Sequence, residues 1–132
     1  MKNFLAFGLL LLLFGCEFGS EKELAVANGL RIYQQHCMAC HGEKGEGNGL
    51  LYPPLQKSDY MLQDSVRTLQ HIVQGVSGSL VVNGVSYRGI MPSEPTLNDV
   101  ELGYLMTYLY NSWGRVGGHF TPDWIARNKP IN

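Results

Sequence analysis

The chain contains the pentapeptide Cys37-Met38-Ala39-Cys40-His41, around which the rest of the sequence can be interpreted. Its C-x-x-C-H spacing is the attachment signature of a c-type haem. The two intervening residues allow both thiols to add across the two vinyl groups of one haem, forming thioethers. The next residue then lies beneath the iron. We therefore expect one covalent haem c, held by Cys37 and Cys40, with His41 as an axial iron ligand.

Two other uses of a Cys-x-x-Cys pair fit this sequence less well. A thioredoxin-like dithiol would lie in a βαβ context, which the flanking sequence does not show. A zinc site needs four ligands, and no second pair of Cys or His residues has a suitable spacing. The histidines outside the motif are expected to have structural roles; they are His36, His71 and His119.

The second axial ligand determines the type of haem protein, because an open iron site binds gases or peroxide whereas two protein ligands favour electron transfer. We expect Met91 to be this ligand, since Pro92 restricts its backbone to an extended form and Gly89 permits a close approach of the loop. Met61 is the second choice. The other methionines are expected elsewhere: Met1 in a signal peptide, Met38 inside the motif and Met106 on the apolar face of a helix.

Ligation by His and Met raises the reduction potential relative to two histidines. Both ligands stay bound in both oxidation states, so little atomic rearrangement accompanies electron transfer. The sequence therefore predicts an electron-transfer protein and not an enzyme. A gas sensor or peroxidase-like protein with an open iron site is the less favoured alternative, because no distal His or Arg is convincingly placed.

Residues 1–15 have the pattern of a secretory signal peptide. Lys2 precedes an apolar run of eleven residues, which is too short to cross a membrane as a helix. The run ends in Leu-Phe-Gly-Cys16, which resembles a bacterial lipobox and implies that Cys16 is lipidated. We expect an exported protein, anchored by lipid on the periplasmic side of a bacterial membrane, with residues 16–23 as a tether and 24–132 as the haem-carrying domain.

The charge is nearly balanced, with 10 Lys and Arg residues against 11 Asp and Glu residues. The basic residues are scattered along the chain. A protein that binds nucleic acid would need a clustered basic face, so no nucleic-acid partner is expected.

Apolar periodicity and capping residues predict three main helices, at about 24–37, from 64 or 65 to 75, and at 98–114. Asn83-Gly84 between β-branched residues predicts a short β-hairpin within 79–87. The tail after residue 114 shows little periodicity. The fold class is therefore all-α, with three main helices around one haem and a hairpin before Met91. The face of the first helix expected to be buried carries Val26, Leu30, Tyr33 and Cys37.

From about residue 24 to residue 113 the chain resembles the monohaem class I cytochrome c family. Gly29 and Tyr33 match the family positions where the first helix crosses the last, and Leu105 and Tyr108 match the partner positions. The segment Tyr-Arg-Gly-Ile-Met-Pro at 87–92, with a later Trp-Gly, is similar to small bacterial cytochromes that are subunits or partners of oxidoreductases.

This resemblance implies the class I fold and two further site residues. The carbonyl of Pro53 is expected to accept a hydrogen bond from the His41 imidazole, and Leu55 is expected to pack on the haem. The implied partners are redox proteins: a membrane oxidoreductase complex or a terminal reductase or oxidase. The chain would either carry electrons between them or be a permanent haem subunit of a larger oxidoreductase.

Overall fold

The computed structural model describes residues 20–114 and 117–130. The predicted signal peptide, the Cys16 lipidation site and residues 16–19 of the predicted tether lie outside these residues. The rest of the predicted tether is not a linker, because residues 21–23 form the first turn of a helix that Ser20 caps. Among the residues that are described, no helix has the length and apolar composition required to cross a membrane.

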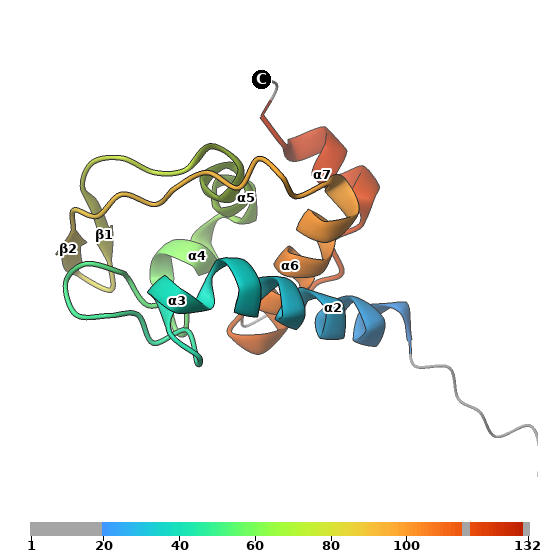
Figure 1. The fold of residues 1–132 in the computed structure, drawn as a ribbon, viewed down its shortest axis with the longest axis horizontal. Coiled ribbons are helices and arrows are strands. Elements are labelled where there is room, and N and C mark those ends of the chain that lie inside the picture. Colours follow the sequence, from blue (N-terminus) through green and yellow to red (C-terminus); the bar gives the residue numbers. More distant parts are fainter. Residues whose placement is uncertain (1–19, 115–116, 131–132) are drawn as a thin grey trace, which may run out of the picture.

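The three predicted helices are present as α2 (Glu21–His36), α5 (Ser65–Gln74) and α6 (Asp99–Ser112). The predicted hairpin is β1 (Leu80–Val82) and β2 (Val85–Tyr87), an antiparallel pair. It lies at the opposite end of the molecule from the C-terminal helix (Figure 1). Three shorter helices complete the described part of the chain: α3 (Met38–His41), α4 (Asp59–Gln63) and α7 (Pro122–Asn128).

The crossing of α2 and α6 forms the centre of the core. A side chain at Gly29 would collide with the backbone of Tyr104 and the Cβ of Tyr108, so glycine permits the close approach. Tyr33 is fully buried, and its ring centroid lies 5.5 Å from that of Tyr108. The crossing expected from Gly29, Tyr33 and Tyr108 is therefore confirmed.

The predicted buried face of α2 was wrong at Leu30, which is 38% exposed. The buried positions of this helix are Ala25, Gly29, Ile32 and Tyr33. A small residue must lie at the crossing with α6, so the contact face is centred on Gly29 and not on the larger apolar side chain beside it.

Side-chain caps explain where the long helices begin. The Ser20 hydroxyl accepts a hydrogen bond from the Glu23 N–H, and the Glu23 carboxylate accepts one from the Ser20 N–H. This capping box starts α2 at Glu21, three residues before the predicted start. Asn98 and Glu101 form the same arrangement at the start of α6.

Apolar periodicity does not predict α4 and α7, because both helices are too short to show it. Both nevertheless have capping signals that could have been recognised. The Ser58 hydroxyl accepts a hydrogen bond from the Met61 N–H at the start of α4. Thr121 caps α7, and Pro122 occupies its first position, where proline is favoured.

The hairpin is joined to α4 by reciprocal hydrogen bonds. The Asp59 carboxylate accepts from the Asn83 N–H at 2.7 Å, and the Asn83 side-chain oxygen accepts from the Asp59 N–H at 3.0 Å. Asn83 and Gly84 both have positive φ, as the Asn-Gly turn requires. These two hydrogen bonds fix the hairpin against α4.

Candidate haem-binding site

The attachment motif continues the line of α2 after a local break. Cys37 ends α2, and its N–H donates to the carbonyl of Tyr33 at 2.9 Å. The N–H of His41 donates in turn to the carbonyl of Cys37. The single turn α3 begins directly after Cys37 and carries Cys40 and His41. Cys37 and Cys40 are half-buried and are not joined by a disulfide.

His41 is held in a defined orientation. Its side chain is buried, and its Nδ1 lies 2.9 Å from the carbonyl oxygen of Pro53. A proton on Nδ1 donates to this carbonyl, which leaves Nε2 as the nitrogen with a free lone pair. Burial lowers the pKa of His41, and the Pro53 hydrogen bond opposes this shift. The neutral imidazole that results is the form that binds metals.

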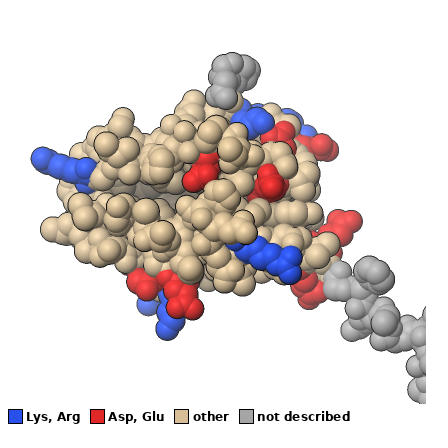
Figure 2. Space-filling model, viewed as in Figure 1, with Lys and Arg blue, Asp and Glu red and all other residues tan. Residues whose placement is uncertain are grey.

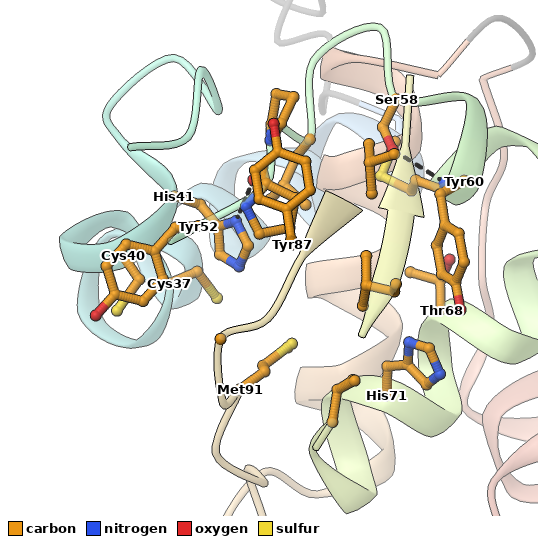
Figure 3. Close-up of a pocket in the computed structure, with 18 of the residues that line it drawn as sticks. Cys37, Cys40, His41, Tyr52, Ser58, Tyr60, Thr68, His71, Tyr87 and Met91 are labelled. Carbon is orange, nitrogen blue, oxygen red and sulfur yellow. Dashed lines mark hydrogen bonds between the residues drawn. The ribbon is translucent and has the colours of Figure 1, made fainter. Parts of the chain in front are cut away.

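His41 points into a mainly apolar pocket between the attachment motif, the hairpin and α5 (Figure 3). The pocket holds about 1030 Å³ of empty space, including the part open to solvent. The surface around the hollow consists mainly of residues other than Lys, Arg, Asp and Glu (Figure 2). Every site residue named from the motif and the resemblance lines this pocket: Cys37, Cys40, His41, Pro53, Leu55 and Met91.

Two methionines line the pocket, so the structure brings both predicted ligand candidates to it. Met91 is half-buried, and its thioether points into the space that the His41 ring also faces (Figure 3). Met61 lies on α4 and is 3% exposed. Its carbonyl accepts a hydrogen bond from the Tyr110 hydroxyl, which fixes the α4 backbone in the core.

The loop that carries Met91 is held by its backbone. The N–H and C=O groups of Met91 pair with those of Val76, each at 2.9 Å. Gly75 has a φ of +76°, and a Cβ there would lie 2.6 Å from the carbonyl oxygen of Met91. Gly89 does permit a close approach, but its nearest neighbour is the carbonyl of Leu51, where a Cβ would lie at 2.6 Å. The loop that carries Met91 therefore packs against Gly75 and Val76, which follow α5, and against the backbone of Leu51.

Several polar pocket residues were missed by the sequence analysis. Tyr60 and His71 stack with ring centroids 5.7 Å apart, and the Arg67 guanidinium lies 3.8 Å from the Tyr60 centroid. Burial lowers the pKa of His71, and the Arg67 charge adds to this shift. The other missed polar lining residues are Tyr52, Ser58 and Thr68. Their only available sequence signal was proximity to capping residues and to the hairpin.

These residues fit a covalently attached haem. The two thiols lie one helical turn apart beside an imidazole whose Nε2 is free, and a thioether faces the same apolar space. Burial raises the pKa of the Cys37 thiol to about 12, with Glu94 and Cys40 adding to the shift. The donor set of nitrogen and sulfur is one that proteins use for haem iron.

Comparisons with known proteins agree with this chemistry. Residues 24–109 match the profile of a family described as cytochrome C oxidase, cbb3-type, subunit III. Over 92 residues the chain is 30% identical to a cytochrome c-552 of Thermus thermophilus, covering 67% of this chain and 70% of that protein. This chain belongs to the monohaem class I cytochrome c family. The matched region of this cytochrome begins in α2, ends in α6 and contains every pocket residue named above.

Two further relatives show how far the similarity extends. This cytochrome is 32% identical over 95 residues to a second cytochrome c-552 of Thermus thermophilus, covering 69% of the chain and 64% of that protein. It is 29% identical over 96 residues to a cbb3-type cytochrome c oxidase subunit CcoP of Azospirillum sp., covering 67% of the chain but 29% of that subunit. The chain thus spans less than two thirds of this second cytochrome c-552 and under a third of the oxidase subunit.

Proposed function

We propose that this chain carries single electrons on one haem c, attached through Cys37 and Cys40 and ligated by His41 and Met91. The observation that supports this best is the convergence of two thiols, an oriented imidazole and a thioether on one apolar pocket. When bound, the haem supplies an iron that alternates between Fe(III) and Fe(II).

The chain's own residues would control that iron in two ways. The Pro53 carbonyl holds the Nδ1 proton of His41, which keeps Nε2 available and the ring fixed in both oxidation states. The apolar lining excludes water and disfavours the more highly charged Fe(III) form. Together with thioether ligation, this environment favours a higher reduction potential than two histidines would give.

The first test identifies the ligand by two matched substitutions. Met91→Leu and Met61→Leu each replace a thioether by a side chain of similar volume, which cores usually tolerate for under about 1.5 kcal/mol. In the matured ferric protein, the near-infrared band of thioether-bound iron should disappear in Met91→Leu and persist in Met61→Leu. The reverse result would make Met61 the ligand. Loss of haem from the parent protein in acidified acetone would exclude covalent attachment.

We further propose that the electron partners are membrane oxidoreductases or terminal reductases and oxidases. Support comes from the similarity to a subunit of a cbb3-type oxidase and to the subunit III family profile. The same haem chemistry serves a mobile carrier and a permanent subunit. Purification from native membranes separates the two, because a permanent subunit should remain with its complex in stoichiometric amount.

Membrane anchoring through Cys16 and location on the periplasmic side are proposed from the sequence pattern alone. A single acyl chain binds membranes weakly, whereas two or more hold a protein stably. The Cys16→Ser variant should therefore appear in the soluble fraction of the exported proteins, with its haem spectrum unchanged. Membrane association that survives this substitution would contradict the proposed anchor.

A further inference from the structure

A hydrogen bond between His36 and Glu94 joins two distant segments beside the pocket, and it is an ion pair only when His36 is protonated. The Nδ1 of His36 lies 3.0 Å from the Oε2 of Glu94, and the two side chains are 29% and 20% exposed. His36 is the last residue of α2 and immediately precedes Cys37. Glu94 lies three residues after Met91. The pair therefore connects the attachment motif to the loop of the proposed Met91 ligand.

Two sets of backbone hydrogen bonds anchor the Met91 loop to α5 and to the residues that follow it. The Glu94 N–H donates to the carbonyl of Ile72 at 2.9 Å, and Met91 pairs with Val76. The Glu94 side chain extends from this anchored backbone to the end of α2. A substitution of the side chain leaves the backbone hydrogen bond in place, so the contribution of the ion pair can be measured separately.

We infer that the His36–Glu94 pair is a positioning contact that holds the Met91 loop against the attachment motif and slows the departure of the Met91 thioether from the iron. This inference rests on the proposed ligation by Met91. Neither His36 nor Glu94 binds the iron; they act through the loop. If the Met91 loop moves away from the attachment motif, His36 and Glu94 must separate, because His36 lies at the end of α2 and Glu94 lies in the loop.

The expected size of the effect follows from the exposure of the pair. When its His is protonated, a partly exposed His–carboxylate contact of this kind contributes about 0.2–1 kcal/mol. If that contribution is lost when the loop opens, its removal should speed thioether dissociation by about 1.4- to 5-fold. Glu94→Gln keeps an acceptor oxygen for the His36 N–H, so its rate should lie between those of the parent and Glu94→Ala.

The measurement is the rate at which excess imidazole replaces the thioether in the ferric holoprotein, read from the loss of the near-infrared band. At saturating imidazole this rate equals the dissociation rate of the thioether. The variants are His36→Ala, Glu94→Ala and the double variant. Lys129→Ala is the matched control, since it removes the other described ion pair, Lys129–Asp99, whose side chains are similarly exposed at 38% and 32%.

Both single variants should exchange faster than the parent, and the double variant no faster than the faster single one, because the pair acts as a unit. Lys129→Ala should keep the parental rate even if its unfolding midpoint falls. Parental rates in both single variants, additive effects or an equal acceleration in Lys129→Ala would overturn the inference. If Met91→Leu keeps the near-infrared band, the proposed ligation by Met91 is wrong. The exchange rates then describe another ligand and do not test the His36–Glu94 pair.

Discussion

The hydroxyl of Tyr33 donates a hydrogen bond to the carbonyl oxygen of Gly42, with 2.6 Å between the two oxygens. Tyr33 is fully buried in α2, and Gly42 directly follows His41. Burial raises the pKa of Tyr33 above its ordinary value, so the hydroxyl remains a donor across the neutral and mildly alkaline range. The bond fixes the end of the attachment motif to the helix that crosses α6.

Replacing Tyr33 by Phe removes this bond and leaves the Gly42 carbonyl without its partner. We expect a loss of about 1–2 kcal/mol in the free energy of unfolding of the holoprotein, the usual cost for a hydrogen bond of this kind. Denaturant unfolding measures it. Tyr104→Phe is the control, because its hydroxyl has no hydrogen-bond partner among the described residues. An equal loss in both variants would assign the effect to removal of a hydroxyl group as such and not to this hydrogen bond.

The lowered pKa of His71 predicts a loss of stability in acid. The folded protein binds this proton more weakly than the unfolded chain, whose His pKa is about 6.5. The contribution of neutral His71 is therefore fully present above that pH and is lost as the pH falls below it. His71→Gln should lose less stability than the parent between about pH 7.5 and pH 5. Unfolding curves across this range, with the exposed His119→Gln as control, test the assignment.

Gly75 should be more sensitive to substitution than Gly78, because of its contact with Met91. Gly75→Ala would place a Cβ 2.6 Å from the Met91 carbonyl, whereas Gly78→Ala, also with positive φ, would meet nothing within 4 Å. Both variants incur backbone strain of roughly 1–3 kcal/mol, because φ is positive at both positions. Only Gly75→Ala should also speed the replacement of the proposed Met91 ligand by imidazole. Equal exchange rates in the two variants would mean that the contact does not position Met91.

Gly29→Ala tests the helix crossing, where two effects have opposite signs. Alanine is favoured over glycine in a helix by about 0.8–1 kcal/mol. The added Cβ would, however, meet the backbone of Tyr104, and overpacking costs about 1–3 kcal/mol or more. We expect net destabilisation and a lower yield of holoprotein. Ala27→Gly, at an exposed position of the same helix, measures the helix preference alone and should cost about 0.5–1 kcal/mol.

The sequence predicted the parts of the fold that depend on local signals. The Asn98 cap gave the start of α6, and Asn83-Gly84 gave the hairpin turn. Periodicity failed for α4 and α7 because helices of five and seven residues have too few turns to show it. It also misplaced Leu30, because the buried face of α2 depends on the backbone of Tyr104, which no local pattern shows.

The candidate site was predicted to a similar extent. The motif and the resemblance named the residues that converge on the pocket, including the hydrogen bond from His41 to the Pro53 carbonyl. The pairing of Met91 with Val76 and of His36 with Glu94 could not be predicted, because each joins segments whose relative position is set by packing. The choice between Met91 and Met61 stays a prediction.

The crossing of α2 and α6 has a consequence for how the chain folds. It brings together two distant helices and encloses most of the pocket-lining residues, those between residues 42 and 97, in one large loop. Closing a loop costs entropy that rises by only about 0.6 kcal/mol for each doubling of its length. Insertions between these two helices should thus add little to the entropy lost when the crossing forms. Relatives could therefore lengthen the pocket loops, and so reshape the surface met by a redox partner, without rebuilding the core.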